Sequence, residues 1–168
     1  MNALLFALLL AQTPAATGVH AELIAQLDDA ASKLQQLGEA IPQDKQAWRP
    51  APGVRSVAEV LSHVTVANYL IVGFTGVKAP EGSPQAETPA ADRAQAVAQL
   101  QRSFDHVRSA IRGMSNADLD KPATLFGQQT TNRGVLLLTV THAHEHLGQL
   151  IAYARTNGVT PPWSMGNQ

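Results

Sequence analysis

Cysteine is absent from this chain of 168 residues. Its absence excludes disulfides, thiolate catalysis and cysteine-based zinc sites, so any bound metal must be held by histidine and carboxylate side chains. Clusters of basic residues are absent as well, and the net charge is only −1. Nucleic acids and anionic lipid surfaces are bound through clustered Lys and Arg, so neither is an expected partner.

The chain begins with an apolar run over residues 1–11 that only Asn2 interrupts. The run is too short to span a bilayer, and small residues follow it at 13–18, which is the pattern of a secretory signal peptide. We therefore expect residues 1–18 to be a signal peptide. The mature protein would be periplasmic or secreted, without stable membrane insertion. No Lys or Arg precedes the run, which leaves the first helix of a cytosolic protein as the alternative.

The remaining residues, 19–168, fit one globular domain, because 45% of the chain is hydrophobic and 15% is charged. Four segments repeat apolar residues every three or four positions, the period of an amphipathic helix. These segments are 23–41, 56–76, 97–114 and 132–156. No strand pattern competes with them, so the predicted fold class is all-α, a four-helix bundle.

Two segments between the predicted helices lack this period. Lys78 to Asp92 contains three prolines, one glycine and two glutamates, so we expect a loop. Ser115 to Thr131 is expected to be irregular, with Pro122 and Gly127 as breakers.

The candidate functional residues of this sequence are histidines. His142 and His146 lie one turn apart on the last predicted helix and project from the same face, at the edge of its apolar stripe. His63 lies at the equivalent edge of the second helix. Imidazole is a common ligand for divalent metals, and two rings at this spacing can bind one ion. The spacing alone leaves an alternative open, in which these are hydrogen-bonded histidines without a metal.

Three further histidines occur at positions 20, 106 and 144. His106 lies well off the apolar stripe of the third helix and is expected to be exposed. His144 is half a turn away from the pair and is expected to face solvent. His20 is close to the start of the predicted mature chain.

Two blocks of this sequence resemble the DinB-like, or YfiT-like, superfamily. Residues 48–64, WRPAPGVRSVAEVLSHV, are similar to its Trp-x-Pro block that ends in a helix-two histidine. Residues 142–150, HAHEHLGQL, are similar to its block His-x-x-x-His-x-Gly-Gln. The resemblance covers roughly residues 21–164. It implies an up-down-down-up bundle in which His63, His142 and His146 bind one divalent metal ion, with zinc and nickel the expected ions.

The up-down-down-up arrangement requires a long connection between the second and third helices. The loop from Lys78 to Asp92 is a candidate, since its roughly 15 residues can reach about 50 Å along a helix about 30 Å long.

The resemblance also implies a function, a metal-dependent hydrolase or a thiol-dependent transferase that acts on an unknown small molecule. Export argues against the thiol branch, because the small thiols concerned are cytosolic. Glu59, one turn before His63, is a weak catalytic candidate that could orient its ring, although it also completes a capping box with Ser56. Tyr153 is a second weak candidate. A non-catalytic extracytoplasmic metal- or ligand-binding bundle remains the alternative function, and a homodimer remains an open form.

Overall fold

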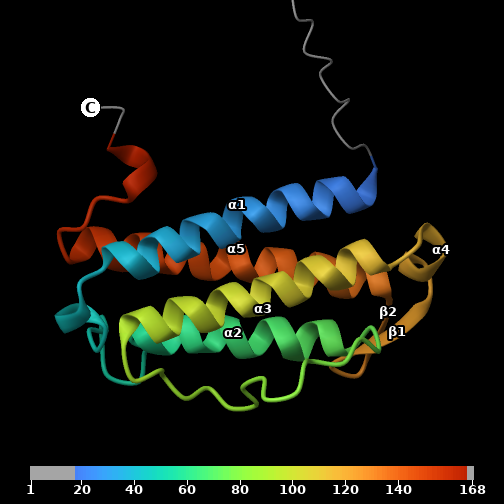
Figure 1. Ribbon diagram of the computed structural model, residues 1–168, viewed down its shortest axis with the longest axis horizontal. Coiled ribbons are helices and arrows are strands. Elements are labelled where there is room, and N and C mark those ends of the chain that lie inside the picture. The colour runs from blue at the N-terminus through green and yellow to red at the C-terminus, as the bar shows by residue number, and fades with distance from the viewer. Residues whose placement is uncertain (1–17, 166–168) are drawn as a thin grey trace, which may run out of the picture.

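The computed structural model describes residues 18–165, and the predicted signal peptide lies almost entirely outside them. Four long helices form a bundle (Figure 1). Their bounds are α1 Val19–Ala40, α2 Val57–Gly73, α3 Arg93–Gly113 and α5 Asn132–Thr156. Short elements join or follow them: η1 Gln43–Lys45, α4 Asn116–Leu119, β1 Pro122–Leu125, β2 Gln128–Thr131 and η2 Pro162–Ser164.

The bundle has the up-down-down-up topology that the resemblance implied. In Figure 1, α1 and α5 run in one direction, while α2 and α3 run in the other. Each of α1 and α2 packs against both α3 and α5, so consecutive helices α1 and α2 occupy opposite corners. The segment between α2 and α3, residues 74–92, runs back along the bundle, as predicted for the loop from Lys78 to Asp92. We call it the crossover segment.

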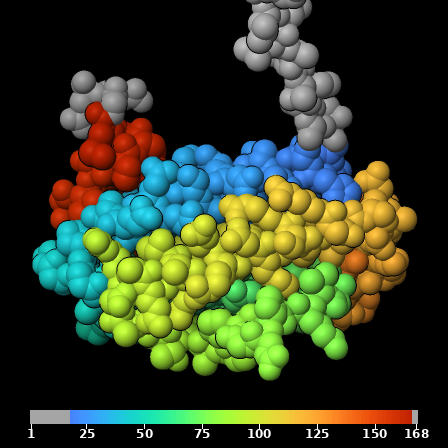
Figure 2. All heavy atoms as spheres, viewed as in Figure 1, coloured from blue at the N-terminus to red at the C-terminus, as the bar shows by residue number. Residues whose placement is uncertain are grey.

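The predicted apolar stripes form the core. The largest side chains that are completely buried come from all four long helices, and they include Leu27, Leu34, Leu61, Phe104 and Leu136. Each such side chain stabilises the fold by about 1.5–3 kcal/mol relative to an exposed one. On the face shown in Figure 2, α1 and α3 lie side by side, with the green atoms of α2 and the crossover segment below them.

The start of α2 has the predicted capping box. The Ser56 hydroxyl accepts from the backbone N–H of Glu59 at 3.3 Å, and the Glu59 carboxylate accepts from the backbone N–H of Ser56 at 2.6 Å. The helix ends at Gly73, three residues before Gly76, which adopts a φ of 87° in the turn that follows. Because both residues of the box satisfy N–H groups that the helix leaves open, the position of the first turn of α2 is well defined.

The segment Ser115–Thr131 is not irregular as predicted. It contains the single turn α4 and an antiparallel hairpin in which β1 pairs with β2. Phe126 and Gly127 form the two-residue turn, with φ of 47° and 82°, as in the tight turns that suit hairpins. The Phe126 ring packs on Phe74 at the end of α2, with centroids 4.9 Å apart.

Within residues 18–165, no helix has the length and hydropathy that crossing a bilayer requires.

Candidate metal centre

Three imidazole rings from two antiparallel helices meet at one edge of the core. His63 comes from α2, and His142 and His146 come from consecutive turns of α5. The Nε2 atom of His142 lies 3.0 Å from Nε2 of His63 and 3.2 Å from Nε2 of His146. The structure therefore brings together the three histidines that the sequence singled out, and their ligand atoms all lie within 4.8 Å of one another.

The second ring nitrogen of His63 is held by the crossover segment. His63 Nδ1 lies 2.8 Å from Oε1 of Glu87. The other carboxylate oxygen, Oε2, accepts from Nε of Arg55 at 3.1 Å and lies 3.0 Å from its Nη2 in an ion pair. An ionised carboxylate can only accept, so Nδ1 of His63 carries the proton and Nε2 presents its lone pair to the other two rings.

Glu59 does not orient His63. Its carboxylate is used by the backbone of Ser56 and by Nη2 of Arg49 at 3.1 Å. The orienting role considered for Glu59 is taken by Glu87, which lies 24 residues after His63 in the sequence. No periodicity in the crossover segment indicated this residue.

His146 is oriented by a chain of hydrogen bonds that ends on the backbone. The Tyr153 hydroxyl donates to the carbonyl of Arg55 at 3.1 Å, so its oxygen is free to accept from the Gln149 amide at 2.8 Å. That direction turns Oε1 of Gln149 toward Nδ1 of His146, 2.8 Å away. His146 Nδ1 is then the donor, and its Nε2 also presents a lone pair.

Tyr153 therefore takes part in the site without reaching its centre. It is buried at 6% exposure, and the edge of the Trp48 ring packs on it with centroids 5.2 Å apart. Trp48 and Gln149 belong to the two sequence blocks described above, and Tyr153 lies three residues after the second block. The structure gives these residues one shared task, which is to fix the ring of His146.

The donor set fits a divalent metal ion. Two imidazole nitrogens bound at about 2.0–2.1 Å to one ion are about 2.8–3.0 Å apart if the ion is octahedral and about 3.3–3.4 Å apart if it is tetrahedral. The two observed separations of Nε2 atoms, 3.0 and 3.2 Å, lie between these limits. Two of these atoms present lone pairs to a third nitrogen, an arrangement that a shared cation stabilises. Among the described residues nothing bonds to the buried Nδ1 of His142, so this ring is the least constrained of the three.

The surroundings keep two of the rings neutral. Burial, followed by the neighbouring His146, His63 and Arg55, lowers the pKa of His142 to about 4. Burial also lowers the pKa of His146 below its ordinary value, although the bond to Gln149 opposes it. Metal binding requires unprotonated imidazole, so both shifts keep the site competent at neutral pH.

His144 does not join the triad. Its side chain is half-buried, with Nδ1 3.0 Å from the backbone oxygen of Val140 and Nε2 4.0 Å from Asp29. The prediction that it faces solvent holds only in part, because α1 lies beside it and leaves the side chain half-buried.

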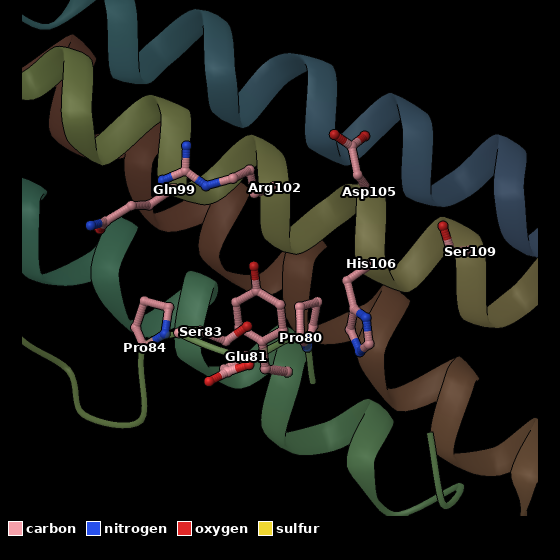
Figure 3. Close-up of a pocket in the computed structure, with 11 residues that line it drawn as sticks. Pro80, Glu81, Ser83, Pro84, Gln99, Arg102, Asp105, His106 and Ser109 are labelled. Atoms are coloured by element: carbon pink, nitrogen blue, oxygen red, sulfur yellow. The ribbon is translucent and has the colours of Figure 1, made fainter. Parts of the chain in front are cut away.

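His106 is buried, contrary to the prediction that it is exposed. Its exposed fraction is 9%, its ring packs against Tyr69 of α2 with centroids 5.3 Å apart, and burial lowers its pKa. The side chain extends from α3 toward Pro80 of the crossover segment (Figure 3). A cavity of about 520 Å³ lies there, between α3, Tyr69 and the crossover segment. His106 was predicted to be exposed because the sequence does not show that the crossover segment covers this face.

The fold and the site define a class: a four-helix bundle of up-down-down-up topology with a three-histidine site between α2 and α5. The family model described as the DinB superfamily matches residues 26–150. The chain belongs to this superfamily. The uncharacterised protein YjoA of Bacillus subtilis is 24% identical over 127 residues, which are 74% of this chain and 82% of YjoA.

Solved structures share the fold. A DinB-like protein from Bacillus cereus superposes with a TM-score of 0.75 at 18% identity, over 83% of this chain and 93% of its own. YfiT from Bacillus subtilis, described as a probable metal-dependent hydrolase with an unusual four-helix bundle topology, gives a TM-score of 0.68 at 18% identity, over 89% and 95% of the two chains. At this identity the likeness establishes the fold alone.

Proposed function

We propose that this protein is an exported metal-dependent hydrolase or transferase that holds one divalent ion, zinc or nickel, through His63, His142 and His146. The observation that carries the proposal is the convergence of the three Nε2 atoms, two of which have their lone pairs fixed by Glu87 and Gln149. Three protein ligands leave positions for water or substrate, the property of a catalytic rather than a structural site.

A divalent ion at this site supplies Lewis-acid activation of a carbonyl or of a water molecule. The chain itself supplies fixed ligands and a charged surrounding. Glu87 and Arg55 hold the ring of His63, and the chain from Arg55 through Tyr153 and Gln149 holds the ring of His146. Arg55 thus connects both supports, through its side chain to one ring and through its carbonyl to the other.

A second function, a non-catalytic metal- or ligand-binding protein, is supported by one observation. Two acidic groups beside the triad are already engaged: Glu59 with Ser56 and Arg49, and Glu87 with His63 and Arg55. The Tyr153 hydroxyl is likewise engaged, because it donates to the Arg55 carbonyl and accepts from the Gln149 amide. None of these three side chains is therefore a free acid or base.

The test is elemental analysis of the mature chain purified without a polyhistidine tag, followed by assays with ester, amide and thiol substrates. We expect about one divalent ion per chain and turnover that requires it. His146→Ala should lose both, whereas His144→Ala, on the same helix, should keep both. Stoichiometric metal without turnover would favour the binding protein. A chain without metal would overturn the metal-dependent enzyme and the metal-binding protein alike.

A further inference from the structure

A charged cavity of about 640 Å³ lies directly beside the triad. Two of its lining residues touch ligand rings: Glu87 bonds to His63 and Gln149 bonds to His146. The remaining walls are the turn before α2 and the first turn of α2, which provide Arg49, Gly53, Val54, Arg55 and Glu59. A molecule in this cavity would contact two side chains, Glu87 and Gln149, that bond directly to ligand rings.

The carboxylates of this cavity are already satisfied. Both oxygens of Glu59 accept hydrogen bonds, one from Arg49 and one from the backbone of Ser56. The bond from Ser56 and the pairing with Arg49 outweigh burial and lower the pKa of Glu59. Burial raises the pKa of Glu87, but the bonds from His63 and Arg55 outweigh it and hold this pKa below its ordinary value. Both groups stay ionised, so neither can donate a hydrogen bond to a ligand.

The arginines, by contrast, keep unused donors. Arg49 donates from Nη1 to the backbone oxygen of Val54 and from Nη2 to Glu59. Arg55 contacts Glu87 through Nε and Nη2. A guanidinium carries more N–H groups than these contacts use, and both side chains are exposed by about two fifths, at 40% and 43%. The free hydrogen-bonding capacity of the cavity therefore lies mainly in cationic donors.

Arg55 also lies close to the triad, because the Glu87 carboxylate that it contacts bonds through its other oxygen to His63. A group bound to this guanidinium would lie at the border between the cavity and the ligand rings.

We infer that the substrate of the triad carries an anionic group, a carboxylate or a phosphoryl group, that Arg55 binds in this cavity with help from Arg49. Planar guanidinium groups recognise both anions through paired charge-assisted hydrogen bonds. The inference rests on the proposed function, since it names the substrate class of that same site. It assigns Arg55 a role in specificity in addition to its contact with Glu87.

Binding of small probes to the full mature chain tests this inference without relying on turnover. The matched pair is monomethyl succinate and dimethyl succinate, which share the same ester and differ in one charge. Inorganic phosphate is the phosphoryl probe, and its comparison with monomethyl succinate separates the two anions. Affinities are measured by calorimetry on metal-free and metal-loaded protein at low ionic strength. We expect the charged ester to bind about tenfold or more tightly than the neutral one.

The variants separate anion binding from a purely structural role of Arg55. Arg55→Gln should remove the preference for the charged ester, and Arg49→Gln should reduce it. Glu87→Gln breaks the same ion pair but leaves the guanidinium free, so it should keep or strengthen the preference. If Arg55 only supports Glu87, Arg55→Gln and Glu87→Gln would change the preference for the charged ester in the same way. Arg112→Gln, at the far end of the bundle, is the control for a general effect of charge.

Three results would overturn the inference: equal affinity of the two esters for the unmodified protein, no binding of monomethyl succinate or phosphate at millimolar concentration, or a preference that survives in both arginine variants. Failure of the proposed function has a different signature. A chain that binds the anions through Arg55 but turns over no ester, amide or thiol substrate would keep the anion site and refute the enzyme.

Discussion

His63 Nδ1 lies 2.8 Å from Oε1 of Glu87, and this contact joins a helix of the bundle to the long segment that crosses over it. The segment exists because α2 and α3 run in the same direction, so the chain must return along the bundle before α3 can begin. In this protein the return path also brings a carboxylate to the back of a candidate metal ligand. Topology and site chemistry are therefore coupled at one residue.

Glu87→Gln is expected to weaken metal binding by about tenfold or more. The amide can still accept from His63, but it loses its charge and its ion pair with Arg55, so it raises the basicity of the ring less. Competition with a chromogenic chelator measures the affinity. Glu81→Gln is the matched control, because Glu81 lies in the same segment but lines the other cavity. Equal affinities in the two variants would show that Glu87 has no influence on the site.

Gln149→Leu is expected to reduce metal affinity about 10- to 100-fold, because it removes the acceptor that fixes the Nδ1 proton of His146. Tyr153→Phe should have a smaller effect in the same direction, since it leaves Gln149 in place and removes only the hydroxyl that orients the amide. Affinities from chelator competition, measured alongside far-ultraviolet circular dichroism, check both. An effect of Tyr153→Phe larger than that of Gln149→Leu would contradict the proposed order of the chain.

The sequence predicts the bundle well, because helical periodicity is local information. In the structure, residues of the predicted stripes are completely buried, among them Leu27 and Leu34 of α1 and Phe104 of α3. The edge positions of His63, His142 and His146 follow from the same periodicity, so their meeting was predictable once the helices were known to pack on one another.

The features that the sequence did not predict have a common physical cause: they lie in, or depend on, segments whose apolar residues follow no regular spacing. Glu87 and the covering of His106 both depend on the path of the crossover segment, and a loop of this composition has no register that the sequence reveals. The hairpin was missed because its strands are only four residues each and β2 is polar. Its turn at Phe126 lacks the Asn or Asp that usually indicates such turns.

Metal removal should lower the melting temperature of the protein. The ion would join α2 to α5 and would bind only to the folded state. It would stabilise the folded state by about 2.7 kcal/mol when the free metal concentration exceeds the dissociation constant by about 100-fold. For a domain of this size that corresponds to roughly 5–10 °C. Thermal unfolding with and without a chelator checks this, after elemental analysis of each sample. His142→Ala should have the same melting temperature with and without the chelator. A chelator effect of the same size in that variant would place the stabilising ion elsewhere.

His106 offers a test of stability against pH that does not involve the triad. Burial lowers its pKa below the ordinary value of 6.5 in the folded state, so the unfolded chain binds more protons as the pH falls below about 6.5. The free energy of unfolding must then decrease from that pH down to the folded-state pKa. His106→Phe removes this titration and retains a ring that can pack against Tyr69. It also eliminates the buried Nε2, which has no partner among the described residues.

The comparison is between the melting temperatures of the unmodified protein and His106→Phe at pH 7.5 and pH 5.5, both with chelator present. The triad is the same in the two proteins, so its own titration cancels in the difference. We expect the melting temperature of His106→Phe to rise relative to that of the unmodified protein as the pH is lowered, because only the unmodified protein must keep a buried imidazole neutral. A difference that is the same at both pH values would mean that His106 is hydrated in solution, and that the crossover segment does not cover α3 as the structure describes.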